Sequence, residues 1–207
     1  MIRLDLHNTN KKCGKNTLIL NITTALECPS KKLGLCAIQK VCYAKQAELR
    51  YHHRVLPYRK QQAKAWKVLR AQEITKQIVL NAIHRHTAIK YLRVSECGDF
   101  RNQKDIDKLS EIAHRLEKYG ILVYTYTKRK DLDFNNISDN LIVNGSEFML
   151  HNEFRVVDNY FEDNAKCVQN CAICNLCKGK NHLVIENKFH GVAFNYLKRR
   201  RNENQKS

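Results

Sequence analysis

The sequence lacks internal repeats and low-complexity linkers, and its 207 residues include only seven glycines and two prolines. Nothing in it therefore marks a boundary between separate modules. The length suits a single domain covering residues 1–207, which is long enough to bury a substantial core. Hydrophobic residues make up 43% of the chain, which is too many for a disordered segment.

Long apolar runs are also missing. No stretch approaches the roughly 18 apolar residues that span a bilayer. The N-terminal residues lack the apolar core of a secretion signal. We therefore expect a cytoplasmic protein that has no membrane partner.

Acidic residues are scarce relative to basic ones. The chain has 20 Asp and Glu against 37 Lys and Arg, a formal net charge of +17. The basic residues are spread along the chain, with clusters at 31–32 and 128–130 and a basic tail at 198–207. Such a surface favours nucleic acid as a partner through counterion release. No recognised nucleic-acid-binding motif accompanies the charge. The charge therefore does not locate a binding site, and it does not show whether a substrate is a small molecule or a macromolecule.

Cysteine is plentiful by contrast. Seven of the nine cysteines fall in two windows near opposite ends of the chain, a first window at residues 28–42 and a second at 167–177. In a cytoplasmic chain such cysteines indicate metal ligands or catalytic thiols rather than disulfides, and the odd total agrees.

Between the windows, strand patterns alternate with helix patterns. This alternation predicts an α/β fold with about six mostly parallel strands, most simply a partial (β/α) barrel closed by a C-terminal cysteine-rich metal-binding loop. The expected strands are 16–24, 89–95, 121–127 and one beginning at 141–143, with weaker candidates at 154–157 and 182–186; the expected helices are 58–86 and 105–118.

Polar side chains follow three of these strands. The carboxyl ends of parallel strands meet at one edge of a sheet, where ligands bind. We therefore expect Glu96, Asp99, Lys128, Asn144 and Ser146 to face a cofactor or substrate there. Asp99 can alternatively cap a helix or turn, and the others can simply be solvated. No catalytic residue is identified from the sequence.

The second window places Cys167, Cys171, Cys174 and Cys177 within one short loop. Two-residue spacers allow a loop to curl so that successive thiolates point inward, as in loops that wrap a [4Fe-4S] cluster. Structural zinc is the alternative metal, although its paired cysteines are usually separated by a longer spacer. Four reduced, buried cysteines acting as small hydrophobic side chains would be a third explanation.

The first window places Cys28, Cys36 and Cys42 in the loop after the first strand. Radical-SAM enzymes hold a [4Fe-4S] cluster with three thiolates in this position, which leaves one iron to bind S-adenosylmethionine. The spacing here is wider than their usual one. The three thiolates can instead form a closed site with Cys13, Cys97 or a thiolate of the second window. One cluster shared by both windows and unliganded cysteines are further alternatives.

These residues also carry a family resemblance. The segments 21–24, 28–29, 42–44, 96–100, 124–128 and 140–146, followed by the second window and His190-Gly191, resemble in order the "gene product 88" family of phages and plasmids. The similarity extends from about residue 16 to 191. Cys13 lies outside the matched motifs, and Cys97 stands where a small residue is expected. His190 can be a ligand, an acid or base, or a structural residue.

The resemblance implies a mobile-element protein in the cytoplasm of a bacterial host. The Cys42-Tyr43-Ala44 segment of this chain, which it shares with that family, is similar to a segment of phage proteins that are grouped with radical-SAM-like barrels. We therefore expect an iron–sulfur protein with one or two clusters and radical-SAM-like activity at the barrel mouth. The alternative is a non-enzymatic nucleic-acid-binding protein stabilised by a structural cluster or by zinc.

Overall fold

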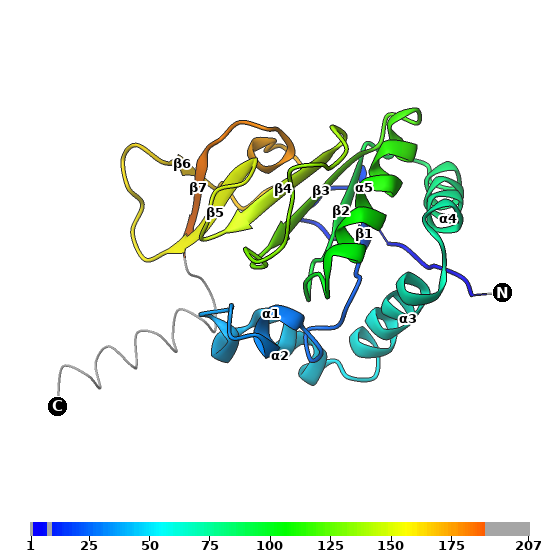
Figure 1. The fold of residues 1–207 in the computed structure, drawn as a ribbon, viewed down its shortest axis with the longest axis horizontal. Coiled ribbons are helices and arrows are strands. Elements are labelled where there is room, and N and C mark those ends of the chain that lie inside the picture. Colours follow the sequence, from blue (N-terminus) through cyan, green and yellow to red (C-terminus); the bar gives the residue numbers. More distant parts are fainter. Residues whose placement is uncertain (1, 8–9, 189–207) are drawn as a thin grey trace.

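A single parallel sheet organises the chain. The computed structural model describes residues 2–7 and 10–188, and the sheet has seven strands in the order β1-β2-β3-β4-β5-β7-β6 (Figure 1). Every neighbouring pair is parallel. The α/β prediction is thus confirmed, and the two-residue β6 was not expected. The strands are β1 (Thr17–Leu20), β2 (Tyr91–Val94), β3 (Leu122–Thr127), β4 (Leu141–Ser146), β5 (Asn152–Val157), β6 (Ala165–Lys166) and β7 (Val184–Lys188).

The main helices lie between β1 and β3 in the sequence. Their bounds are α1 (Pro29–Lys32), α2 (Tyr43–Arg50), α3 (Val55–Val68), α4 (Ala71–Ile83) and α5 (Gln103–Glu117), with short 3-10 turns η1 (Gln39–Val41) and η2 (Leu176–Lys178).

The prediction of one helix over 58–86 is wrong, because two helices occupy this region. Leu69 is extended, with φ −77° and ψ 144°, and Arg70 donates its main-chain N–H to the Glu73 carboxylate at 2.7 Å. This hydrogen bond gives an acceptor to a main-chain N–H at the start of α4, where N–H groups have no acceptor within the helix. Both helices pack against the same core, so the apolar periodicity continues across the break and conceals it.

Side chains on the strands alternate between two faces. Leu92, Val94, Val123, Leu141 and Val143 are buried in one core together with apolar residues of α3, α4 and α5. Figure 1 shows α5 lying over the β1–β3 part of the sheet. Because successive residues of a strand point to opposite sides, the residues between these core positions face away from the helices.

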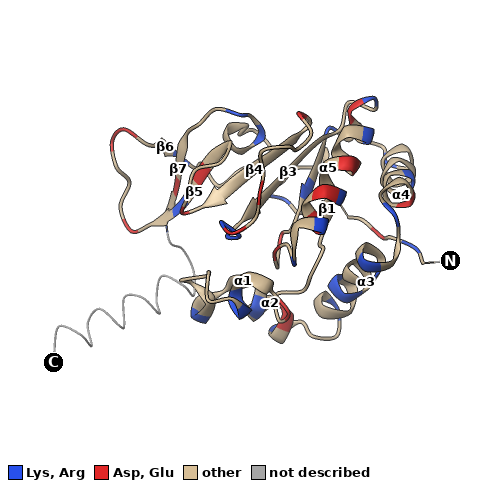
Figure 2. Ribbon diagram, in the orientation of Figure 1, with Lys and Arg blue, Asp and Glu red and all other residues tan. Residues whose placement is uncertain are grey.

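Lys and Arg positions are distributed over the whole ribbon, and several of those marked blue in Figure 2 lie on α1, α2 and α3. The predicted basic tail at 198–207 lies outside the described residues. Within the described ranges, none of the helices has the length and apolar character needed to cross a bilayer.

Candidate functional site

A cavity of about 630 Å³ lies against the strand residues that face away from the helices. This volume is within the range of about 300–1,000 Å³ typical of small-molecule sites. We call the strand side chains that line it the cavity floor: Arg93, Tyr124, Tyr126, Phe154, Val156, Ile185 and Asn187. Residues of α2 and the second cysteine window form its walls.

The cavity gathers several of the residues expected at the site. Glu96, Lys128 and Ser146 line it, and so do all four cysteines of the second window. The prediction that polar groups following separate strands share one mouth therefore applies to these three. Asp99, Asn144 and the first-window cysteines are not among the lining residues.

Asp99 is a buried structural carboxylate. Its Oδ2 accepts hydrogen bonds from the Ser30 hydroxyl at 2.6 Å and the Lys128 main chain at 2.8 Å. Its Oδ1 accepts from Thr127 Oγ1 at 2.7 Å and from the Phe100 main chain at 2.8 Å. These bonds tie α1 to the ends of β2 and β3. Burial raises the pKa of Asp99, although all four donors oppose that shift.

Asn144 is also occupied by structural bonds. Its side-chain amide donates to the carbonyls of Thr125 and Cys177, both at 3.0 Å, and its oxygen accepts from Asn152 at 3.0 Å. Asn152 in turn donates to the Gly179 carbonyl at 2.7 Å. The two asparagines thus fasten the second cysteine window to β4 and β5.

The first-window thiols lie close enough to influence one another. The pKa of Cys28 responds to Cys36, and that of Cys36 responds to Cys42. Nearby main-chain N–H groups favour the thiolate form and so act to lower the pKa, those of Lys31 and Ser30 at Cys28 and that of Ile38 at Cys36. Burial nevertheless raises the pKa of Cys28 to about 11. The free thiols of Cys28 and Cys36, whose pKa values burial raises, are therefore protonated at neutral pH, and a metal would have to displace their protons.

A fifth thiol, which the spacing of the second window did not reveal, lies beside that window. It belongs to Cys13, which is fully buried next to Cys171. Arg93 donates to Cys13 Sγ at 3.2 Å. The Cys171 hydrogen bond and the Arg93 charge lower the pKa of Cys13 to about 6, against the opposing effect of burial.

Cys13 was weighed only as a partner of the first window, and the contact between residues 10–14 and the second window explains why its place beside Cys171 was not predicted. Ala172 donates its N–H to the Lys12 carbonyl at 3.1 Å. Gly14 packs so closely that an added Cβ would lie 2.9 Å from the Ala172 Cβ. Nearly the whole chain separates Cys13 from Cys171, so no sequence spacing connects them.

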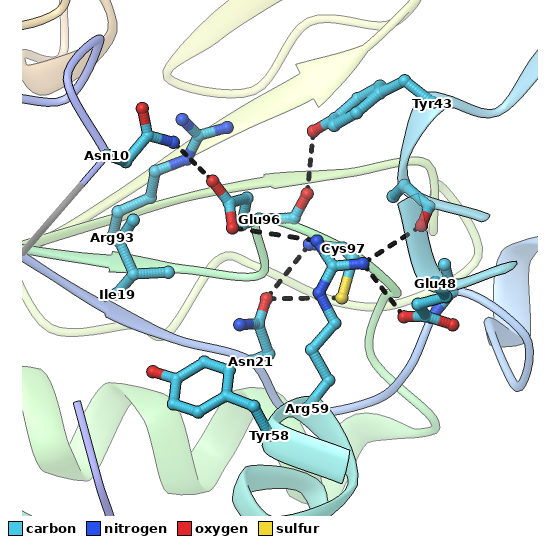
Figure 3. A network of polar contacts seen from close by, with 12 residues as sticks. Asn10, Ile19, Asn21, Tyr43, Glu48, Tyr58, Arg59, Arg93, Glu96 and Cys97 are labelled. Carbon is cyan, nitrogen blue, oxygen red and sulfur yellow. Dashed lines mark hydrogen bonds and ion pairs between the residues drawn. The ribbon is translucent and has the colours of Figure 1, made fainter. Parts of the chain in front are cut away.

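A buried ion network positions Glu96 at the cavity edge (Figure 3). Arg59 lies 3.0 Å from Glu48 and 3.8 Å from Glu96, and Glu96 also accepts from Asn10 at 2.5 Å. Glu48 receives the main-chain N–H groups of Ala25 and Leu26. Sequence reasoning missed Glu48 and Arg59, because their partners come from distant segments.

Cys97 is buried next to this network. Its thiol donates to Asn21 Oδ1 at 3.4 Å and to the Thr23 carbonyl at 3.5 Å. Burial raises its pKa well above the usual value for a thiol. The side chain packs with Ala25, Ala44 and Cys42, so its observed contacts are those of a small core residue.

The thiols do not form a preformed site for a single ion. Among residues 2–7 and 10–188, no three or more His, Cys, Asp or Glu side chains are placed to hold one metal ion. Zinc requires its sulfur donors at about 2.3 Å from one point. A cluster distributes its thiolates over several iron atoms. The all-sulfur donor sets, with N–H donors at Cys28 and Cys36 and at Cys167, fit that chemistry. His190 lies outside the described residues.

Comparison with known proteins gives one match. The model of the family described as Gene product 88 matches residues 4–194. No curated protein and no solved structure matches the chain.

Proposed function

The chain belongs to the gene product 88 family, and we propose that it is an iron–sulfur protein with a radical-SAM-like site at the edge of its cavity, where Ile38 and Val41 of the first window line the wall. The observation that carries the proposal is the grouping of Cys28, Cys36 and Cys42 in the segment that follows β1, where nearby main-chain N–H groups favour the thiolate form of Cys28 and Cys36. Such donors stabilise thiolate sulfur.

We interpret the sheet as a partial (β/α) barrel whose interior is the cavity. The alternation of strand residues between the helix-packed core and the cavity floor supports this interpretation. In barrels of this kind the site is built at the carboxyl ends of the strands. The first window follows the carboxyl end of β1 in the chain.

The first window would hold the catalytic cluster. A [4Fe-4S] cluster on three thiolates supplies an electron and leaves one iron available to S-adenosylmethionine. Lys128 influences Cys36 electrostatically and pairs with Glu147 at 3.0 Å. Glu96 is held by Asn10 and Arg59. These groups and Ser146 would bind the polar parts of the cosubstrate in the cavity.

The second window would hold an auxiliary cluster, with Cys13 as a fifth candidate thiolate. The pKa of Cys177 responds to Cys167 and Cys174, whereas that of Cys28 responds to Cys36 and that of Cys36 to Cys42, so each window's thiols act on thiols of the same window. This separation favours two clusters over one shared by both windows. Zinc remains the alternative metal for this loop.

Iron and sulfide analysis of anaerobically purified protein, with EPR of the reduced form, tests the proposal. About eight iron atoms per chain indicate two clusters and about four indicate one. Cys36→Ala and Cys42→Ala should abolish binding of S-adenosylmethionine, whereas Cys171→Ala should retain it. Cys97→Ser is the matched control and should keep its iron. A colourless protein containing stoichiometric zinc would refute the proposal.

The basic surface supports a second candidate, a non-enzymatic nucleic-acid-binding protein with structural metal. Exposed Lys32, Lys40, Arg50, Lys60 and Lys64 lie on or between α1, α2 and α3 (Figure 2). A gel shift that weakens steeply with salt, without cleavage of S-adenosylmethionine under reducing conditions, would favour this function.

A further inference from the structure

Three buried polar atoms at the cavity have no hydrogen-bond partner in the part of the chain that the structure describes. They are Nε of Arg93, Oγ of Ser95 and the hydroxyl of Tyr124. Buried polar groups are nearly always paired, because an unpaired group loses its hydration without compensation. The one other such atom among the described residues, Gln61 Oε1, does not line the cavity.

The three groups are neighbours on two adjacent strands, β2 and β3. Arg93 on β2 and Tyr124 on β3 are register partners. Ser95 follows β2 directly and has a φ of +59°, a conformation that a non-glycine residue adopts only when its surroundings impose it. Its main-chain N–H donates to the Leu20 carbonyl at 2.8 Å, which holds it in place.

Arg93 also has no carboxylate partner among the described residues. Its observed polar contact is with Cys13 Sγ. The two carboxylates that line the cavity are paired with other cations, Glu96 with Arg59 and Glu147 with Lys128. A guanidinium stays charged in proteins and matches the planar geometry of carboxylate and phosphate. Cys13 Sγ accepts from only one of its terminal nitrogens, so the Nε–H of Arg93 remains available to an anion in the cavity.

An aromatic surface adjoins this charge. The rings of Tyr124 and Tyr126 are 6.3 Å apart and those of Tyr126 and Phe154 are 5.3 Å apart. The Arg93 guanidinium lies 5.3 Å from the Tyr126 ring centroid. Flat ligands pack well against such surfaces.

We propose that Arg93, Ser95 and Tyr124 form an anion subsite on the cavity floor, which binds the carboxylate or phosphate of a small substrate whose flat ring lies against Tyr126 and Phe154. This inference rests on the proposed function, because it concerns the substrate that would bind in the same cavity.

Calorimetry on anaerobically purified protein tests the subsite with two pairs of probes. Each pair compares an anion with a neutral analogue: 4-hydroxybenzoate with 4-hydroxybenzamide, and uridine monophosphate with uridine. We expect about tenfold tighter binding of the anion in at least one pair, and that pair identifies carboxylate or phosphate. Arg93→Gln should remove the preference, and Tyr124→Phe, which deletes one oxygen, should reduce it. Arg115→Gln on α5 is the matched control and should leave it unchanged.

Equal binding of both members of each pair by the natural protein would overturn the inference, as would an anion preference that survives in both Arg93→Gln and Tyr124→Phe. Loss of iron from Arg93→Gln with the preference intact would assign Arg93 to the Cys13 and Cys171 thiols instead. Iron content and binding of S-adenosylmethionine are measured on the same samples. An anion preference without iron refutes the proposed function alone, and iron without the preference refutes the subsite alone.

Discussion

Gly98 lies in the turn that carries Glu96 and Asp99 to the edge of the cavity. Its φ is +76°, and an added Cβ would lie 1.9 Å from Thr23 Oγ1. That hydroxyl accepts the Asp99 main-chain N–H and donates to its carbonyl, so it has little room to move. Glycine at position 98, within the segment 96–100 that carries part of the family resemblance, therefore has a steric reason. The backbone there approaches Thr23 so closely that only glycine fits.

We predict that Gly98→Ala lowers the free energy of unfolding by more than about 2 kcal/mol, from the left-handed backbone and the clash combined. Gly120→Ala is the control, since its φ is +65° and nothing lies within 4 Å of its added Cβ. It should lose only about 1 kcal/mol. Urea denaturation measures both, and equal losses would contradict the steric argument.

Asp105 provides a second prediction at the residue scale. The buried carboxylate accepts from Trp66 Nε1 at 2.8 Å and from the Arg101 guanidinium at 2.6 Å. Burial opposes ionisation, yet the Arg101 and Trp66 hydrogen bonds hold the pKa below its usual value. Stability from this group is therefore present above the unfolded-state pKa of about 3.9 and is lost as the pH falls through the lower folded-state value.

Asp105→Ala should reduce the free energy of unfolding by about 3 kcal/mol at pH 7, because it leaves buried donors unpaired. The difference from the natural protein should shrink as the pH falls below about 4. Asp107→Ala, exposed on the same helix, should change little at either pH. A difference independent of pH would show that the carboxylate charge contributes nothing.

At the scale of elements, the second cysteine window depends on side chains rather than on regular structure. It contains only the short η2 turn. Asn144 and Asn152 bind its carbonyls at Cys177 and Gly179, and Lys178 donates to the Cys171 carbonyl at 2.6 Å. Asn144 was expected to face a cofactor, but it positions the loop that forms the cavity wall.

Asn144→Asp keeps the side-chain shape and replaces both donors with an acceptor that faces two carbonyls. We predict a loss of about 2–3 kcal/mol in unfolding free energy, with faster hydrogen exchange across residues 167–178. If the loop holds the auxiliary cluster, iron per chain should fall by about half. Asn136→Asp, exposed in a loop, is the control. Unchanged exchange in the loop would contradict the anchoring role.

At the scale of the whole molecule, the apolar core and the thiols occupy different places. The core joins β1–β4 to α3, α4 and α5, while the second-window cysteines line the cavity. A core of this extent supports folding without a metal. Metal binding should therefore organise the cysteine windows rather than create the fold.

Chelation under anaerobic conditions should remove any bound metal while far-UV circular dichroism retains most of its helical signal. Hydrogen exchange should increase in residues 28–42 and 167–177 and stay slow in β2 and β3. A cooperative loss of the dichroism signal on chelation would instead make metal binding part of folding itself, as the structural-metal alternative requires.

The sequence by itself determined the α/β architecture and most element positions, because apolar periodicity records which face of each segment is buried. Glu96, Lys128 and Ser146, which the sequence placed after separate strands, line one cavity in the structure, since parallel strands end at one edge. Only the tertiary structure decided what depends on contacts between distant segments. These are the break between α3 and α4, the structural use of Asp99 and Asn144, the Cys13–Cys171 contact and the unpaired Nε of Arg93. Local patterns carry no information on such contacts, because each one arises only when the chain has folded.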